Sequence, residues 1–112
     1  MKILMTIITS IMLMINTINY NVSWYGGKHH GRKTASGEVF DKNKLTCAAV
    51  AKYKFGEKLE VTNTKTGRSV IVKVNDRGAF GKYGRELDLS EAAFKKIASA
   101  NQGVIKVSIK RL

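Results

Sequence analysis

Alternating apolar and polar residues mark the clearest strands of the chain. In 58–63 a leucine and a valine alternate with polar residues, and in 68–75 three valines do the same. The TKTG segment between them ends in Gly67, which can adopt the positive φ angle that tight turns often require. We therefore expect these two strands to form a β-hairpin.

Weaker alternation predicts two further strands, one near each end of the same region. A valine and a tryptophan share one face of 21–25, and three β-branched residues share one face of 104–110. The sequence TCAAV, at 46–50, is short and mostly apolar and indicates a buried strand or turn. The stretch 26–44 has little periodicity and many glycine, lysine and polar residues, which predicts a long functional loop.

The periodicity changes to that of a helix near residue 90. Leu89, Ala93 and Ile97 recur at every fourth position, which would place them on one face of an α-helix. Ser90 is a suitable N-cap, and Gly103 can end the helix. The whole pattern predicts an all-β protein with one short α-helix, and strands this short and apolar indicate a small closed barrel.

Residues 1–19 form a segment of different character. An apolar run at 3–15 follows Lys2. This run is too short to cross a bilayer comfortably, since a membrane helix needs about 20 apolar residues, and it suits the core of a signal peptide. We predict a cleaved signal peptide, or alternatively an uncleaved N-terminal anchor that would be the only membrane contact, followed by one folded domain at 20–112. The folded domain would then be secreted or periplasmic, in the cell envelope.

The chain is strongly basic, with 20 lysine and arginine residues against 8 aspartate and glutamate residues. The resulting net charge of +12 favours an anionic partner: nucleic acid, anionic lipid or an acidic wall polymer. The aromatic residues are not interleaved with the basic ones in any nucleic-acid-binding motif, so we expect no nucleic-acid partner. For an exported protein, the lipid and the wall polymer are the better candidates.

Cysteine and histidine offer little chemistry. Cys47 is the only cysteine, so the domain has no internal disulfide, and we expect a buried structural thiol. His29 and His30 are adjacent, so their side chains should point apart, whereas a zinc site needs three or four ligands. We expect each histidine to line a groove or cap a turn. No metal and no cofactor are expected, and the protein should be a monomer.

The carboxylates carry more information. The stretch VNDRGAFGKYGRELDLS, at 74–90, holds Asp76 and Asp88, and Glu38 ends the segment SGE. Strand ends are where a barrel builds its groove, and a partly buried carboxyl group there can act as a general acid on a glycosidic oxygen. Alternatively, the two aspartates only anchor the loop by accepting backbone N–H bonds. Spacing alone leaves both roles open.

Three blocks of the sequence resemble, in order, the rare lipoprotein A-like (RlpA-like) domain. They are SWYGGKHHGRKTASGEVFDKNKLTCAA, FGEKLEVTNTKTGRSVIVKVNDRGAF and LDLSEAAFKKIA, and the resemblance covers about 22–112. It implies a six-stranded double-psi β-barrel related to expansins and barwin. The family includes septal lytic transglycosylases, which cleave the β-1,4 bond between N-acetylmuramic acid and N-acetylglucosamine without water and leave a 1,6-anhydromuramyl end. The resemblance thus implies a lyase whose partner is the glycan strand of peptidoglycan.

The resemblance also assigns roles to individual residues. It places the catalytic acid/base at Asp76 and a second functional carboxylate at Glu38. Asp88 matches an aspartate that lines the groove in expansins, and Arg77 is a partner that holds Asp76 or contacts the glycan. The expected substrate-binding residues are Asp88, Arg77, Tyr25 and His30.

One departure from the family bears on catalysis. The family commonly has a groove histidine where this chain has Ala49. Such a histidine could help orient the glycan or share a proton with the acid. Its replacement keeps a second function open, that of a non-catalytic, expansin-like protein that binds or loosens the wall.

Overall fold

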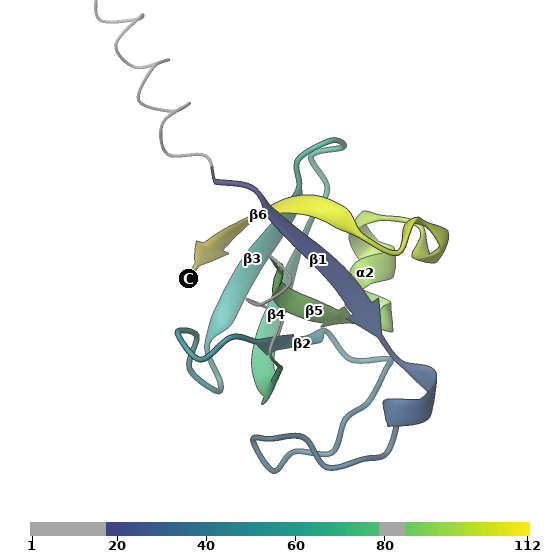
Figure 1. The fold of residues 1–112 in the computed structure, drawn as a ribbon, viewed down its shortest axis with the longest axis vertical. Helices are drawn as coiled ribbons and strands as arrows, with labels where there is room; N and C mark the ends of the chain where they lie inside the picture. Colours follow the sequence, from purple (N-terminus) through teal and green to yellow (C-terminus); the bar gives the residue numbers. More distant parts are fainter. Residues whose placement is uncertain (1–17, 79–84) are drawn as a thin grey trace, which may run out of the picture.

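A computed structural model describes residues 18–78 and 85–112, in which six strands close into a barrel. Around the barrel the strands follow the order β1-β5-β2-β4-β3-β6 (Figure 1). The strands are Tyr20–Tyr25 (β1), Thr46–Ala49 (β2), Lys58–Asn63 (β3), Ser69–Arg77 (β4), Arg85–Ser90 (β5) and Ile105–Arg111 (β6). The helical segments are Gly27–His29 (η1), Glu91–Ile97 (α2) and Ala100–Gln102 (η3). None of these helices is long and apolar enough to cross a membrane.

The strand order brings distant parts of the chain together. β1 pairs in parallel with β5, and β2 pairs in parallel with β4, while the other neighbours are antiparallel. Closure gives every strand two neighbours, so the barrel has no open edge. Because β2 lies between β4 and β5, one residue of β2 can stand beside residues from both strands.

The hairpin predicted from the valine alternation is confirmed as β3 and β4. The turn between them uses Gly67 at φ 77°, a conformation in which a β-carbon would be strained. The N–H of Gly67 donates to the carbonyl of Asn63 at 2.8 Å and closes the turn. Strands predicted at 21–25 and 104–110 are also present, as β1 and β6.

β5 is a strand that the sequence patterns did not identify, although leucine and polar residues alternate in ELDLS, at 86–90. Its last four residues, 87–90, are all buried. Leu89 belongs to this strand, and its predicted place on the face of the helix is wrong. The buried strand predicted from TCAAV is confirmed as β2, all four residues of which are buried.

The helix α2 begins where expected and ends earlier. The hydroxyl of Ser90 accepts the N–H of Ala93 at 3.2 Å, as an N-cap does. The helix ends at Ile97 because Ala98 is extended, with φ −159° and ψ 172°, and a separate 3-10 helix, η3, follows. Gly103 ends η3, with φ 69°, so its predicted role as the end of the α-helix is wrong.

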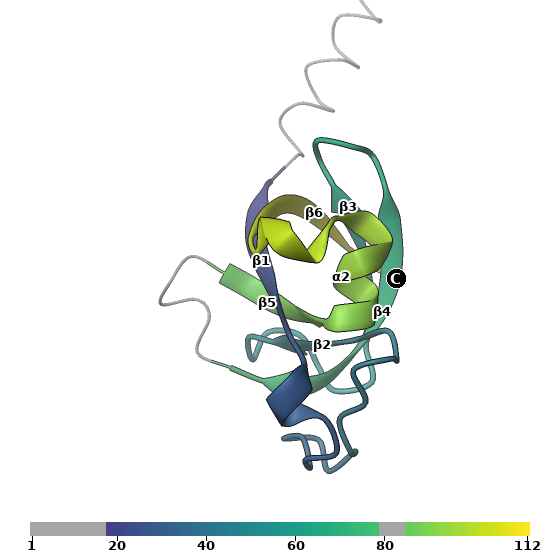
Figure 2. The ribbon, with the colours of Figure 1, turned by 90° about the vertical axis from the view of Figure 1, so that its right-hand side faces the viewer.

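The barrel interior and the inner side of α2 form one hydrophobic core (Figure 2). Phe94 of α2 is fully buried, and the Trp24 ring packs beside it with the ring centroids 6.4 Å apart. The indole Nε1 of Trp24 donates to the carbonyl of Ala100 at 3.1 Å, so its polar atom is satisfied at the core's edge. Cys47 is also fully buried, and burial raises the pKa of its thiol to about 12. The thiol is therefore part of the core, as expected.

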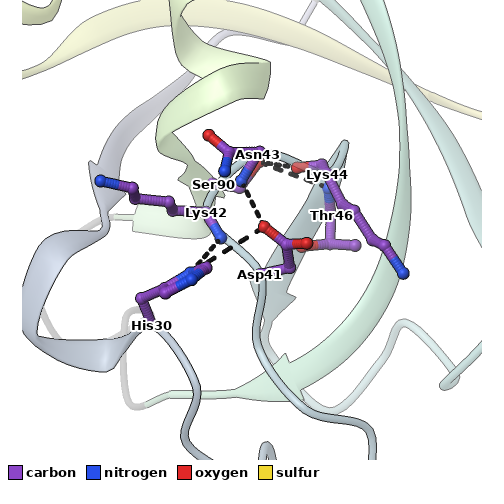
Figure 3. Close-up of polar contacts among 7 residues, drawn as sticks. All are labelled: His30, Asp41, Lys42, Asn43, Lys44, Thr46 and Ser90. Carbon is purple, nitrogen blue, oxygen red and sulfur yellow. Dashed lines mark hydrogen bonds and ion pairs between the residues drawn. The ribbon is translucent and has the colours of Figure 1, made fainter.

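The segment between β1 and β2 is a long loop held at several points. The N–H of Thr34 donates to the Glu38 carbonyl and that of Phe40 to the Arg32 carbonyl, both at 2.7 Å. Phe40 is buried at 2% exposure, so the loop has an apolar anchor of its own. Ser90 closes the far end, because its hydroxyl donates to the carbonyl of Lys44 at 2.6 Å (Figure 3). These bonds fix the loop beside one end of the barrel.

Candidate functional site

A cleft of about 210 Å³ opens at the barrel end that faces this loop. Its lining residues come from β1, η1, β2, β4 and β5. They are Tyr25, His29, Ala48, Asp76, Arg77, Gly78 and Asp88. Four of the six residues expected at the site, Tyr25, Asp76, Arg77 and Asp88, therefore lie together, and the remaining two lie outside the cleft lining.

The strand register explains why two aspartates twelve positions apart meet in one cleft. Ala48 is in register with Asp76 of β4 on one side and with Asp88 of β5 on the other. The register with β4 shifts between Cys47 and Ala48. At this β-bulge two residues of β4, Asn75 and Asp76, lie opposite one residue of β2. The small side chain of Ala48 leaves space between the two carboxyl groups.

Asp76 is held by the backbone of two segments. Its Oδ1 accepts the N–H of Ala35 at 3.0 Å and the N–H of Arg77 at 2.8 Å. The loop residue Ser36 adds a further tie, since its N–H donates to the carbonyl of Asn75 at 3.2 Å. Both of these backbone hydrogen bonds are on one oxygen, Oδ1, which orients the carboxyl group.

Asp88 is the more deeply buried of the pair, at 9% exposure. Its Oδ1 accepts the hydroxyl of Ser23 and lies 3.5 Å from Nε of Arg85. Burial raises the pKa of Asp88 above its usual range, and the Ser23 hydrogen bond and the Arg85 charge oppose that shift. The cleft thus holds two carboxyl groups in different environments, a common basis for different roles in acid/base chemistry.

Tyr25 forms an aromatic wall of the cleft. Its ring stacks on Phe40 with centroids 4.6 Å apart and meets the ring of His29 edge-on at 5.5 Å. The phenol oxygen is buried. Burial, and then the negative charge of Asp76, raise the pKa of Tyr25 well above its usual range. A hydrogen-bonding interaction with the Asp76 carboxyl group also contributes to the raised pKa, so the phenol keeps its proton and lies beside Asp76.

Arg77 holds Asp76 with its backbone and not with its guanidinium. The guanidinium lies over the ring of Phe55, with Cζ 4.0 Å from the ring centroid, and its Nη1 is 3.5 Å from the Asp76 carbonyl oxygen. In the described part of the chain no ion pair joins Arg77 to a carboxylate. Of the two roles expected for this side chain, a contact with the glycan fits its position better.

Glu38 does not line the cleft. Its Oε2 lies 2.7 Å from Nζ of Lys73 in an exposed ion pair that joins the loop to β4. The hydrogen bond from Lys73 lowers the pKa of Glu38, which makes the group a poorer proton donor. Its role as a second functional carboxylate stays a prediction.

The two adjacent histidines part, as expected. His29 lies on the cleft wall, and this residue was missing from the set expected at the site. His30 Nδ1 accepts the N–H of Lys42 at 3.2 Å and lies 3.9 Å from Oδ1 of Asp41, so it caps a turn of the loop (Figure 3). Its contact with substrate likewise stays a prediction.

Ala49, where the family commonly has histidine, packs in the hydrophobic core and is fully buried. The β2 residue on the cleft wall is Ala48. In residues 18–78 and 85–112 no group of three or more histidine, cysteine, aspartate or glutamate side chains is arranged to hold a metal ion. The cleft lining itself contributes two carboxyl groups, a phenol, an imidazole and a guanidinium.

Comparison with known proteins agrees with the double-psi barrel. The sequence profile of the family described as lytic transglycolase matches residues 17–109. The chain belongs to this family. Among solved structures, the apo expansin of Clavibacter michiganensis is 27% identical, with a TM-score of 0.67 over 86% of this chain and 50% of the expansin chain. The predicted double-psi barrel is thus confirmed.

Curated members of the family are close in sequence. The endolytic peptidoglycan transglycosylase RlpA of Neisseria meningitidis serogroup B is 49% identical over 92 residues, 82% of this chain and 38% of that protein. The probable endolytic peptidoglycan transglycosylase RlpA of Aquifex aeolicus is 54% identical over 90 residues, 80% of this chain and 39% of that protein. The chain spans less than half the length of these relatives.

Proposed function

We propose that this chain is a catalytic domain that cleaves the β-1,4 bond between N-acetylmuramic acid and N-acetylglucosamine in peptidoglycan, as an endolytic lytic transglycosylase. The observation that carries the proposal is the pair Asp76 and Asp88 on either side of Ala48 at the floor of an open cleft. Relatives named as peptidoglycan transglycosylases, at 49% and 54% identity over the same domain, support it. The substrate would be the glycan strand.

The reaction needs one group that gives a proton and takes one back. Asp76 in its acid form donates its proton to the glycosidic oxygen, and the bond from C1 of the muramyl residue to that oxygen breaks. The muramyl 6-hydroxyl then attacks C1, and its proton passes to the Asp76 carboxylate, which restores the acid. No water enters the products, and a 1,6-anhydro ring forms. The two N–H bonds on Oδ1 keep the carboxyl group in place through both transfers.

The remaining cleft residues would stabilise the charge that develops between these steps. Asp88, when ionised, places negative charge across Ala48 from Asp76, close to the positive charge of an oxocarbenium-like transition state. The Tyr25 phenol keeps its proton and would donate a hydrogen bond to a sugar oxygen. The Arg77 guanidinium at the rim would bind hydroxyl or carboxylate oxygens of the glycan.

A second function, binding or loosening of the wall without turnover, is the alternative that the replacement of the family histidine by Ala49 keeps open. In that case the cleft would hold a glycan through hydrogen bonds and charge without cleaving it. Binding that depends mainly on the net charge of +12 should weaken steeply as salt is added. Either function would operate at the cell envelope, and the protein would act as a monomer. Residues 1–19 would serve as a cleaved signal peptide or as an uncleaved anchor.

The test is the chemistry of the products. Purified protein is incubated with peptidoglycan sacculi, and the soluble products are analysed by mass spectrometry. We expect fragments with 1,6-anhydromuramyl ends, which are lighter by one water than the products of hydrolysis. Reducing ends would indicate a hydrolase, and binding to sacculi with no soluble product would favour the wall-binding function.

A further inference from the structure

An exposed aromatic ring lies directly beside the cleft. Phe55, in the connection between β2 and β3, is 43% exposed. Single exposed apolar side chains are common and need no explanation by themselves. This ring, however, covers one face of the Arg77 guanidinium, at 4.0 Å from centroid to Cζ, and Arg77 lines the cleft. Phe55 therefore contacts the site through one residue.

The turn that carries Phe55 is tied to β4 just before the reactive end of that strand. The N–H of Gly56 donates to the carbonyl of Val74 at 2.8 Å, and the N–H of Val74 donates to the carbonyl of Glu57 at 2.9 Å. Gly56 has φ 85°, which favours glycine at this point of the turn. Since Val74 precedes Asp76 by two residues on one strand, the ring and the aspartate share a fixed frame.

The Arg77 guanidinium has two possible partners nearby, the Asp76 carboxyl group and the Phe55 ring. Arg77 follows Asp76 in sequence, and an ion pair between these side chains would favour the ionised carboxylate. The structure instead stacks the guanidinium on Phe55. Stacking uses the flat face of the guanidinium, so its edge of N–H donors stays available.

We propose that Phe55 is a positioning residue that holds the Arg77 guanidinium at the rim of the cleft, away from the Asp76 carboxylate, with its N–H edge toward a bound glycan. The inference rests on the proposed function of the cleft. Loss of the ring has two consequences. The contact of Arg77 with the glycan weakens, and the guanidinium becomes able to pair with the Asp76 carboxyl group.

The titratable groups that share the cleft with Asp76 stay in place when Phe55 changes. They are Tyr25 of β1, His29 of η1 and Asp88 of β5, and within residues 18–78 and 85–112 Phe55 makes no hydrogen bond or ring contact with them. A change in the pH dependence on substitution of Phe55 would therefore report the position of Arg77.

A double-mutant cycle tests the proposal with the full chain. The variants are Phe55→Leu, Phe55→Trp, Arg77→Ala and the double variant Phe55→Leu/Arg77→Ala, assayed by the release of anhydromuropeptides from solubilised glycan strands. Phe55→Leu should lower kcat/KM about fivefold, the size of a cation–π contact at a partly exposed site. It should also move the alkaline limb of the pH profile to lower pH. Phe55→Trp should keep both kcat/KM and the pH profile close to those of the wild type, because indole offers a larger face to the guanidinium.

The background variant separates positioning from a general structural effect. In Arg77→Ala, the further change Phe55→Leu should alter kcat/KM by less than twofold and leave the pH profile where it is. The proposal is overturned by an unchanged kcat/KM in Phe55→Leu, by an equal loss in the Arg77→Ala background, or by failure of Phe55→Trp to restore activity. Thermal unfolding of each variant checks that all are folded.

The same cycle on binding keeps the two proposals distinguishable. If the wild type binds sacculi but releases no anhydro product, the transglycosylase function fails. Co-sedimentation of the four variants with sacculi then decides the role of Phe55. Losses that are not additive support positioning through Arg77, and fully additive losses contradict it.

Discussion

The cleft and the loop between β1 and β2 both hold carboxylates that the sequence singles out, but the surroundings of these groups differ. In the cleft, Asp76 is held by two backbone N–H groups, and Asp88 lies across Ala48 from it at 9% exposure. Glu38, in contrast, makes an exposed ion pair with Lys73, a type of contact that contributes little to stability because solvent screens it. Asp76 and Asp88 thus line the cleft in register with Ala48, whereas Glu38 is exposed and lies outside the cleft lining.

The largest effect should follow from Asp76→Asn. The amide cannot donate an acidic proton, so we expect the release of anhydromuropeptides to fall by about a thousandfold, within the range for general acid–base catalysis. The shape of the side chain is kept, and binding to sacculi should be retained. Initial rates by liquid chromatography check this, with Glu60→Gln on β3 as a matched change outside the cleft. Activity within a factor of ten of the wild type would remove Asp76 from the catalytic role.

Asp88→Asn should have the next largest effect. It removes the negative charge that faces Asp76 across β2, and we expect a loss of about a hundredfold in kcat with a smaller change in KM. Steady-state rates on solubilised glycan give both values. An effect on KM alone would make Asp88 a binding residue only.

The same substitution should change the dependence of stability on pH. Burial raises the pKa of Asp88, so the folded protein binds this proton more tightly than the unfolded chain does. The corresponding stability is fully present below the usual pKa of about 3.8 and is lost as the pH rises through the folded-state value. Urea unfolding at a series of pH values should show this loss in the wild type and its absence in Asp88→Asn. Parallel curves for the two proteins would contradict the buried, raised carboxyl group.

Tyr25→Phe should cost about tenfold in activity, because one hydrogen bond to the substrate is lost. The phenylalanine ring keeps the stacking on Phe40, whose centroid is 4.6 Å away, so the melting temperature should change little. Initial rates and thermal unfolding of the same preparation separate these quantities. Full activity in Tyr25→Phe would mean that the phenol does not face the glycan.

The smallest effect is expected for the exposed ion pair between Glu38 and Lys73. Glu38→Gln removes an exposed ion pair with Lys73, and the rate should stay within about twofold of the wild type. Lys73→Gln, which removes the partner, should behave alike. A tenfold or larger loss of rate in Glu38→Gln alone would place Glu38 within the site, as the family resemblance implies.

Local sequence patterns predicted most readily the strands that have one solvent-exposed face and one buried face. The hairpin of β3 and β4 shows such alternation, and so does β6, which is why both were found. β5 was missed because Leu89 also fits the fourfold spacing of Ala93 and Ile97 and was assigned to the helix, although the leucines of β5 alternate with polar residues. The end of α2 was misplaced because Ala98 leaves the helix without any glycine or proline to mark the break.

The site was predicted in part, and mainly through the family resemblance. Asp76 and Asp88 stood out as carboxylates in a glycine-rich stretch, but their meeting depends on the register shift in β2 beside Ala48, which no local pattern encodes. His29 could not be separated from His30 in the sequence, since the direction of each side chain follows from how the loop folds. Phe55 drew no notice because its importance comes from the guanidinium that it covers.

The central claim is that the chemistry occurs between Asp76 and Asp88 and not at Glu38. The most direct test is the ratio of initial rates of anhydromuropeptide release for Asp76→Asn and Glu38→Gln, measured side by side on one batch of sacculi. We predict that Glu38→Gln is faster than Asp76→Asn by at least about two orders of magnitude. Equal rates, or a slower Glu38→Gln, would contradict the claim.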